Sequence, residues 1–433
     1  MPIIVHIDMN SYFATVEQQS NPFLRGKPIC VAGKASSQRT VCAALSKEAK
    51  KMGCKGPMPV WEAKQICPSI IVVEADFEKY QFISREVFKI LENYTPLIEI
   101  FSIDEAFLDL TNICKNTQEA CGVIRTIKNR IKAEIGDYLT CSAGVSHNKL
   151  LAKLASEMQK PDGLTIIDQT NLPEIMQKTP IEDVCGIGRS TTHKLHDLSI
   201  ITMSDLANCP LERLMNFFGP RLGKKLKLMG QGIDTEPVLP YYEYPAEKSY
   251  GHSYTLSKNI FSAKDTQKVL LKLAEKVGRR MRKEKVSGKT VSVWIRFFDF
   301  SSFGKQTTVT NFTNDGFEIY KIGLSIIEKE NFTKPIRAVG VSVSNIKKSN
   351  EITPSFLNED IKSKNALKSM DEINNRYGEF TVFRSSLSKI KDKVQNIPDG
   401  RDKRIMGNEK PLTRIENWYM IIRLTNICRR ITP

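Results

Sequence analysis

Two adjacent carboxylates interrupt an apolar stretch, FSIDEAFLDL at Phe101–Leu110, and they restrict how the chain can fold. The stretch has the composition of a buried strand, yet Asp104 and Glu105 lie in its middle. Acids are rarely buried unless a partner compensates their charge. The fold must therefore either expose these carboxylates in a turn between two strands or hold them against a cation.

A third acid extends this pattern. The segment Pro2–Asp8 is a short run rich in β-branched residues that ends in an acid, which predicts another buried strand. Acids at adjoining strand ends repel one another unless a cation lies between them. Mg²⁺ prefers carboxylate oxygens, and a pair of such ions can hold both reacting oxygens of a phosphoryl transfer. The spacing alone leaves a hairpin turn and a metal site open, and Asp109 is expected to be a structural or solvated acid.

Length and charge indicate several domains and a polyanionic partner. The chain has 433 residues, more than one core usually holds. Its net charge of +16 favours nucleic acid or an anionic membrane as partner. Residues 248–346 hold 18 Lys and Arg against 8 Asp and Glu, whereas residues 1–168 hold 20 against 19. The polyanion should therefore be bound mainly by the C-terminal half.

Membrane insertion and secretion are not expected. No apolar run approaches the roughly 18 residues that a membrane span needs, and the start MPIIVHIDMN lacks the basic region of a signal peptide. The ten cysteines contain no CxxC pair. Cys30, Cys42, Cys54 and Cys67 are therefore expected to be buried reduced thiols rather than zinc ligands, which favours a cytoplasmic protein.

The periodicity predicts a mixed α+β architecture. Two strands should meet at Asp104–Glu105, and a helix is expected over Thr40–Gly53. Residues 169–236 are expected to be helical with glycine-containing turns. Residues 248–346 show the order βαββαβ, typical of a compact two-layer module.

Five motifs carry a resemblance to a known family. In chain order they are VHIDMNSYFATVE, GCKGPMPVWEAKQICP, FSIDEAFLDLT, SAGVSHNKLLAKLASEMQKPDG and VCGIGRSTTHKL. In order and approximate spacing they resemble the Y-family DNA polymerases, most closely the DNA polymerase IV branch, over roughly residues 1–346. Each motif alone would be weak, but together they are specific.

The resemblance implies a multidomain right-hand polymerase. It would have an α+β palm, small fingers, a helical thumb with a helix–hairpin–helix, and a βαββαβ little finger. The implied division is palm at 1–10 and 75–168, fingers at 11–74, thumb at 169–236, linker at 237–247, little finger at 248–346 and a C-terminal tail at 347–433. The charge step at residue 248 and the βαββαβ order agree with this division independently.

The same resemblance gives the acids a role. Asp8, Asp104 and Glu105 match the family's catalytic metal ligands, with the backbone carbonyl of Met9 as a further ligand for two Mg²⁺ ions. Phe13 matches the steric gate, whose ring excludes a 2′-hydroxyl, and the backbone at Tyr12 is implied to hold the triphosphate.

Three lysines are the implied triphosphate contacts. Lys160 matches a lysine that contacts the incoming dNTP. The family usually has a Tyr and an Arg, three residues apart, on the fingers helix, but this chain has Lys47 and Lys50 there. Lysine keeps the charge and loses the bidentate guanidinium. Lys50 is expected to contact phosphate, whereas Lys47 is equally well explained as a solvated residue.

Two segments are expected to bind DNA. Gly186 and Gly188 lie in VCGIGRSTTHKL, which looks like the hairpin of a helix–hairpin–helix and would let the backbone approach a phosphate. A basic run in the little finger is interpreted as a second phosphate contact rather than a solvated helix face. Its arginines are Arg279, Arg280 and Arg282.

The tail contains one candidate peptide. Many bacterial members of the family dock a short peptide into a sliding clamp, and Phe356 and Leu357 stand where its apolar anchors are expected. The usual Gln is missing, so an ordinary linker explains the stretch equally well.

The resemblance thus implies a monomeric translesion DNA polymerase that extends a primer on a template from dNTPs, with low fidelity and without proofreading. A nucleotide cyclase with a palm-like sheet and a catalytically inactive DNA-binding scaffold are the alternatives. The cyclase would need neither the basic module nor the glycine hairpin, and an inactive scaffold should have lost an acid.

Overall fold

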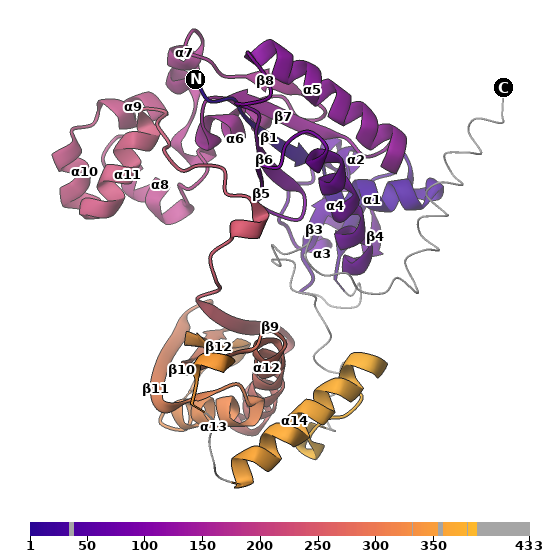
Figure 1. Ribbon diagram of the computed structural model, residues 1–433, viewed down its shortest axis with the longest axis vertical. Helices are drawn as coiled ribbons and strands as arrows, with labels where there is room; N and C mark the ends of the chain where they lie inside the picture. Colours follow the sequence, from indigo (N-terminus) through magenta and orange to yellow (C-terminus); the bar gives the residue numbers. More distant parts are fainter. Residues whose placement is uncertain (34–38, 331, 354–357, 379, 388–433) are drawn as a thin grey trace. The chain divides into compact units, whose positions relative to one another are not determined.

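The computed structural model describes residues 1–33, 39–330, 332–353, 358–378 and 380–387 (Figure 1). They form two compact units. The described part of the first is Met1–Tyr244, and the second spans Pro245–Ile397, described as far as Leu387. In the part of the chain that is described, no helix combines the length and apolar character needed to cross a membrane.

A five-stranded sheet with the order β5-β6-β1-β7-β8 forms the centre of the first unit. Its strands are β1 (Ile4–Met9), β5 (Ile98–Ile100), β6 (Glu105–Asp109), β7 (Cys141–Ser146) and β8 (Leu164–Ile166). The two strands predicted to meet at Asp104–Glu105 are β5 and β6, and they pair antiparallel. The strand predicted at Pro2–Asp8 is β1, which lies between β6 and β7.

The side chains of β1 point alternately into the main core and to the opposite face of the sheet. Val5 and Ile7 pack into the main core against helices α4 (Phe77–Glu92) and α5 (Thr117–Arg130). His6 and Asp8 point to the opposite face, since successive side chains of a strand alternate. That face is covered by α6 (Lys149–Met158), where Ala152 packs with Ile4 and Phe107.

A separate three-stranded sheet, β3-β2-β4, follows the first helix, α1 (Tyr12–Ser20). Its strands are β2 (Ile29–Ala32), β3 (Cys42–Leu45) and β4 (Ile71–Glu74), with α2 (Lys47–Lys51) and α3 (Val60–Ile66) beside them. A small core joins these elements, and it contains four buried cysteines: Cys30, Cys42, Cys54 and Cys67.

The helix predicted over Thr40–Gly53 is wrong in its first half. Cys42–Leu45 forms a strand because Cys42 and Leu45 fill the core beside β2, and this tertiary pairing outweighs helix propensity. Ser46 then starts α2 by accepting a hydrogen bond from the Ala49 N–H, so the helix begins only there.

The rest of the first unit is helical, as predicted. Helices α7 (Leu172–Lys178), α8 (Arg189–His196), α9 (Met203–Asn208), α10 (Leu211–Phe218) and α11 (Pro220–Gly230) share one core with α6. The segment after them, expected to be a linker, is partly docked on the central sheet. Val238 is buried, the Leu239 N–H donates to Glu99, and the Tyr244 hydroxyl donates to the Ile100 carbonyl.

The second unit has the predicted βαββαβ order. Its elements are β9 (Ser249–Ile260), α12 (Ala263–Lys283), β10 (Val286–Phe297), β11 (Ser302–Thr313), α13 (Gly316–Ile327) and β12 (Ile336–Lys348). The strands form one sheet, β11-β10-β12-β9. Both helices lie on the same face, where Leu270, Ile319 and Val341 share a core.

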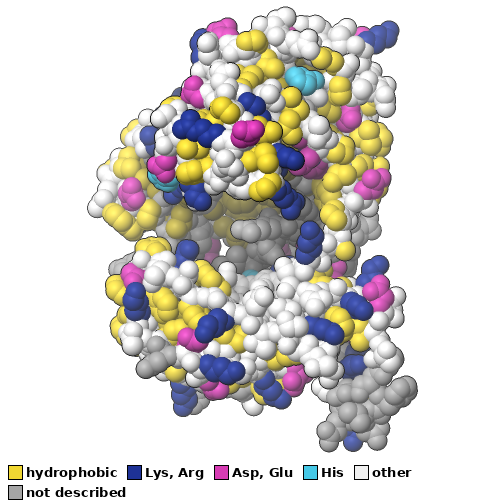
Figure 2. Space-filling view, turned by 90° about the vertical axis from the view of Figure 1, so that its left-hand side faces the viewer, with side chains coloured by type: hydrophobic (Ala, Val, Ile, Leu, Met, Phe, Trp, Pro, Cys, Tyr) yellow, Lys and Arg dark blue, Asp and Glu magenta, His cyan; other side chains and the backbone are white. Residues whose placement is uncertain are grey.

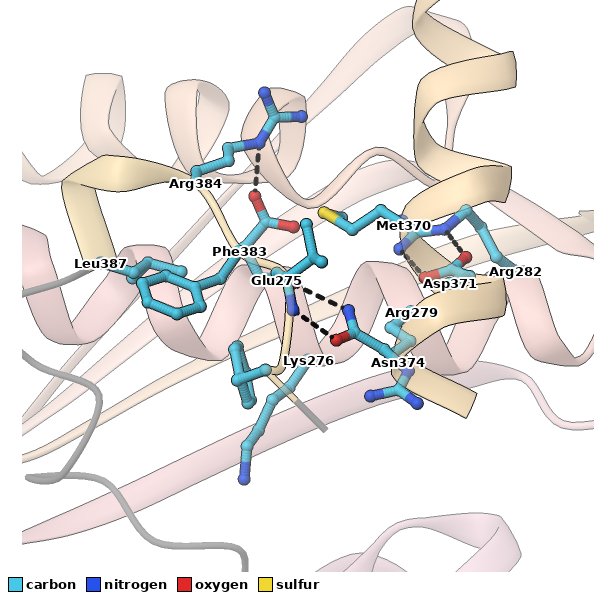
Figure 3. Close-up of a pocket in the computed structure, with 12 residues that line it drawn as sticks. Glu275, Lys276, Arg279, Arg282, Met370, Asp371, Asn374, Phe383, Arg384 and Leu387 are labelled. Atoms are coloured by element: carbon cyan, nitrogen blue, oxygen red, sulfur yellow. Dashed lines mark hydrogen bonds and ion pairs between the residues drawn. The ribbon is translucent and has the colours of Figure 1, made fainter. Parts of the chain in front are cut away.

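A further helix, α14 (Asn358–Tyr377), packs against α12, which the weak pattern of the tail did not predict. Arg282 pairs with Asp371 of α14, and Arg384 pairs with Glu275 of α12 (Figure 3). Leu387 is buried in a small cluster with Leu271. Residues up to Leu387 therefore belong to the second unit.

Candidate functional site

The three predicted acids come together where β1 and β6 adjoin. Asp8 lies directly opposite Glu105 in the antiparallel register, and the Met9 N–H donates to the Asp104 carbonyl at 2.9 Å. The side chains of Asp8 and Glu105 are only 15% and 14% exposed. The acids therefore do not form an exposed hairpin turn.

Each carboxylate has a partner. Lys160 Nζ lies 3.0 Å from Asp8 Oδ1, and the Ser102 hydroxyl donates to Asp104 at 2.7 Å. Lys153 of α6 forms an ion pair with Glu105. Two lysines thus supply cationic charge at the acid cluster.

Glu105 has a second neighbour, His6. Its Nε2 lies 3.1 Å from Glu105 Oε2, and its Nδ1 is 2.7 Å from the Ser156 hydroxyl. His6 and Lys153 were not predicted as site residues. A usable signal was present for His6, because it stands two residues before Asp8 and therefore on the same face of β1.

The acids differ in their electrostatics. Burial raises the pKa of Asp8, and Lys160 offsets this only in part. Burial also raises the pKa of Asp104, and the charge of Glu105 raises it further. For Glu105 burial acts in the same direction, but His6 and Lys153 outweigh it and lower the pKa to about 2.

This donor set fits a hard divalent cation. Buried carboxylates that repel one another gain most from positive charge, and their oxygens are the ligands that Mg²⁺ prefers. Within the described residues, however, no group of three or more His, Cys, Asp or Glu side chains is already arranged around one point. In this arrangement Lys160 pairs with Asp8 and Lys153 pairs with Glu105.

Lys50 lies in the same electrostatic environment as Lys160. Burial lowers the pKa of Lys50, the charge of Lys160 lowers it further, and Asp8 opposes the shift. Lys47 lies elsewhere: its ammonium is 5.3 Å from the centre of the Tyr138 ring. The structure therefore brings Lys50 and Lys160 towards Asp8 and leaves Lys47 on the surface of Tyr138.

Phe13 belongs to an aromatic group. Its ring stacks on Tyr80, with centroids 4.4 Å apart and an angle of 13° between the planes. Tyr80 is itself fixed, because its hydroxyl donates to buried Glu17 at 2.6 Å. The Tyr12 hydroxyl donates to the Tyr80 carbonyl at 2.7 Å. Phe13 is half-buried, so a rigid ring is held at the surface of the core.

The glycine hairpin precedes α8. Gly186 has φ +99°, a conformation that favours glycine, and a Cβ there would lie 3.3 Å from Met229. Gly188 stands at the start of α8, and a Cβ there would meet nothing within 4 Å. The hairpin therefore leaves open space at Gly188 beside the first N–H groups of the helix.

Arg282, predicted to contact phosphate, is engaged by protein groups. Its guanidinium makes two hydrogen bonds to the Asp371 carboxylate, at 2.6 and 2.8 Å (Figure 3). It makes a third to the Asn314 carbonyl. Arg279 donates to Asn375, and Arg280 donates to the Gly251 carbonyl. The phosphate contact of this basic run stays a prediction, and its local pattern did not indicate that α14 lies beside α12.

The sheet of the second unit offers another surface, which the sequence motifs did not predict. Val291, Val293 and Ile295 of β10 face the helices. Alternation therefore places the residues between them on the opposite face of the sheet, which we call the open face. There Trp294 lies between Gly304 and Gly340 in the strand register, and Ser292 lies between Gln306 and Ser342. The small side chains of the open face allow another molecule to approach the backbone closely.

Basic side chains occur on both units. Figure 2 shows Lys and Arg scattered among neutral and hydrophobic side chains on the face in view. On the open face, Arg296 is exposed and its guanidinium lies 5.2 Å from the Trp294 ring centre. The predicted clamp anchors, Phe356 and Leu357, lie outside the described residues.

Comparison with known proteins gives the family. Residues 7–157 match the impB/mucB/samB family, residues 247–355 match the C-terminal domain of that family, and residues 182–234 match the DNA polymerase-iota thumb domain. The chain is 34% identical over 410 residues to DNA polymerase IV of Bacillus velezensis, covering 92% of this chain and 97% of the relative. The chain belongs to the DNA polymerase IV family.

Other relatives agree with this assignment. DNA polymerase IV of Staphylococcus saprophyticus is 38% identical over 346 residues, which cover 80% of this chain and 95% of that protein. Among solved structures, the Y-family DNA polymerase chimera of Dbh and Dpo4 superposes with a TM-score of 0.70 at 28% identity, covering 80% of this chain and 99% of the chimera. The right-hand multidomain α+β fold expected from the sequence is thereby confirmed.

Proposed function

We propose that this protein is a template-directed DNA polymerase that adds deoxynucleotides to a primer 3′-end and tolerates damaged templates. The observation that carries the proposal is the meeting of Asp8, Asp104 and Glu105 at adjoining strand ends in a chain of the DNA polymerase IV family. Lesion bypass and low fidelity come from the family. Neither the cyclase nor the inactive scaffold is favoured, because the acids are all present and the relatives are named polymerases.

Three carboxylates would hold the metal. Asp8, Asp104 and Glu105, with the carbonyl of Met9, are the proposed ligands of two Mg²⁺ ions. When bound, the ions would supply positive charge to the phosphates and to the primer hydroxyl. The raised pKa values of Asp8 and Asp104 support this role, because both groups gain from added positive charge.

The neighbouring side chains would bind and orient the nucleotide. Lys160 and Lys50 would bind the triphosphate, with the backbone at Tyr12. Phe13, stacked on Tyr80, would lie under the sugar and exclude a 2′-hydroxyl. Lys153 would keep Glu105 ionised and aligned.

Two surfaces would hold the primer–template DNA. The hairpin at Gly186 and Gly188 would bind a backbone phosphate, since helix N-termini attract anions. The open face of the second unit would lie along the duplex, because small side chains permit close approach and the unit carries excess positive charge. Arg279 and Arg280 would contribute to this charge.

The remaining assignments come from the resemblance. The protein would act as a monomer on chromosomal DNA in the cytoplasm. Phe356 and Leu357 would dock into a sliding clamp. Clamp stimulation of the wild type, compared with a variant carrying Phe356→Ala and Leu357→Ala, tests that contact.

Primer extension with Mg²⁺ and dNTPs tests the main proposal. Asp104→Asn and Glu105→Gln should each lower the rate of primer extension by about 10²-fold or more, because each removes a carboxylate proposed to bind the catalytic metal ions. Primer–template affinity should change little. Asp109→Asn is the matched control, since Asp109 accepts a hydrogen bond from Thr111 at the other end of β6. Extension at the wild-type rate by either active-site variant would refute the assignment.

A further inference from the structure

Three phenylalanines are exposed at one end of the sheet in the second unit. Phe261 is 82% exposed, Phe298 is 51% exposed and Phe300 is 62% exposed. Single exposed apolar residues are common on protein surfaces, but three large exposed rings at one end of a sheet indicate a binding surface. None of the three is assigned a role above.

The strand register brings these rings together. Ile336, the first residue of β12, pairs with Ile260 at the end of β9 and with Phe297 at the end of β10. Phe261 and Phe298 therefore leave the sheet from neighbouring positions on either side of β12. The Phe298 N–H donates to Pro335, the residue before β12, at 3.0 Å. Phe300 follows in the turn that joins β10 to β11.

Phe298 lies just beyond the end of the open face. Phe297, the last residue of β10, packs inward, with its ring centre 5.8 Å from that of Phe332. Trp294 and Arg296 are two residues apart on β10 and share the open face. Phe298 follows β10 in the turn, where its ring is exposed.

The charges at this end favour an anion. The Arg337 guanidinium lies 4.8 Å from the Phe300 ring centre, and Arg296 lies beside Trp294. A guanidinium stacked on a ring keeps its in-plane N–H groups for phosphate oxygens. The one acid in the turn, Asp299, is compensated by Lys334 at 2.7 Å. Rings alternating with arginines are typical of single-strand binding sites.

We propose that this aromatic end, made of Phe261, Phe298 and Phe300 with Arg296 and Arg337, binds a single-stranded segment of DNA. Unstacked bases lie on Phe298 and Phe300, and the two arginines hold the backbone phosphates. A duplex keeps its bases stacked inside, so only a single strand offers faces for the rings. The inference rests on the proposed function, which supplies DNA as the ligand.

Equilibrium binding to a labelled oligodeoxythymidylate tests the proposal with the full chain. The variant carrying Phe298→Ala and Phe300→Ala should bind the single strand about tenfold or more weakly, since stacking of each base contributes substantially. Binding to a blunt duplex should stay within about twofold, and the salt dependence should not change, because every charge is kept. Phe23→Ala is the control, an equally exposed ring (82%) in the first unit.

Two further variants separate base stacking from general apolar contact. Replacing both residues by Tyr should restore single-strand affinity, and replacing both by Leu should not. Wild-type single-strand affinity in the Ala variant would overturn the proposal. Wild-type single-strand affinity in the Leu variant would also overturn it and would favour a protein partner. Equal losses for single strand and duplex would also overturn it. Because binding needs no catalysis, the Asp104→Asn variant should bind the single strand normally. A failure of the polymerase assignment can therefore be distinguished from a failure of the single-strand proposal.

Discussion

At the residue scale, the acid cluster combines burial with mutual repulsion. Asp104 accepts a hydrogen bond from Ser102, yet burial and the charge of Glu105 raise its pKa above the ordinary value. A carboxyl group whose pKa is higher in the folded than in the unfolded state is destabilising once it is ionised, and this cost is present at neutral pH. Functional sites often trade stability for activity in this way.

Asp104→Asn should therefore raise the melting temperature in the absence of divalent ions, by about 1–4 °C, while abolishing extension. Asn keeps the oxygen that accepts from Ser102 and loses the charge. Added Mg²⁺ should raise the melting temperature of the wild type more than that of the variant, since a ligand that binds the folded state stabilises it. A calorimetric scan with and without Mg²⁺ measures both, and equal Mg²⁺ shifts would contradict the ligand role.

Phe13 provides a second residue-scale prediction. Phe13→Ala should raise the efficiency of ribonucleotide incorporation relative to deoxynucleotide incorporation by about tenfold or more, because the ring is proposed to act by its bulk. Phe77→Leu is a suitable control, since Phe77 touches Phe13 edge-on and leaves the Tyr80 stack in place. Steady-state kinetics showing unchanged sugar selectivity would make Phe13 an ordinary core residue.

The two fingers lysines are a matched pair. Lys50→Ala should raise the KM for dNTP by roughly 10–100-fold, because the variant loses one charge-assisted hydrogen bond to the triphosphate. Lys47→Ala should change it little, because Lys47 lies over Tyr138. An equal change in the KM for dNTP in both variants would contradict the proposal that the triphosphate binds beside Lys160 and Asp8.

At the scale of elements, ion pairs hold the tail on the second unit. Arg282 of α12 pairs with Asp371 of α14, and Arg384 pairs with Glu275 of α12 (Figure 3). Arg384 also pairs with Asp315. Burial raises the pKa of Glu275 in spite of Arg384. Because the folded-state pKa lies above the unfolded one, the contribution of Glu275 to stability is greatest at low pH and is lost as the pH rises through the folded pKa.

Arg384→Ala should therefore destabilise the second unit more at about pH 7.5 than at about pH 5, where Glu275 takes up a proton more readily. The expected loss at the higher pH is about 1–3 kcal/mol, since the variant leaves buried carboxylates without their partner. Combining the change with Glu275→Gln should reduce this pH dependence. Urea unfolding at the two pH values measures the effect, and an equal loss at both would show that Glu275 is not involved.

At the scale of the whole molecule, positive charge is concentrated in the second unit. Residues 248–346 account for most of the excess of Lys and Arg. The first unit has its own cores and includes the docked segment to Tyr244, so a fragment of residues 1–246 should fold alone.

That fragment should lose most of the affinity for primer–template DNA. For the full chain, the logarithm of the binding constant should fall with the logarithm of salt concentration by about 0.9 per phosphate neutralised. The fragment should show a smaller slope. Its melting transition checks that it is folded, and an affinity equal to that of the full chain would contradict the assignment of DNA binding to the second unit.

Local patterns in the sequence were enough for much of this protein. The strand at Pro2–Asp8, the acids at Asp8 and Asp104–Glu105, the βαββαβ order and the charge step at residue 248 could all be predicted, because each depends on neighbouring residues or on counting. The family resemblance added roles for these residues. The meeting of the three acids could be expected only in outline, since strand order is not a local property.

Only the tertiary structure decided the rest. Residues 42–45 become a strand because β2 lies beside them, although the local pattern favours a helix. Lys153 reaches Glu105 because α6 packs across the sheet. Arg282 pairs with Asp371 because α14 packs beside α12. In each case the deciding contact joins residues distant in sequence, and the energy of that contact has no signature in the local pattern.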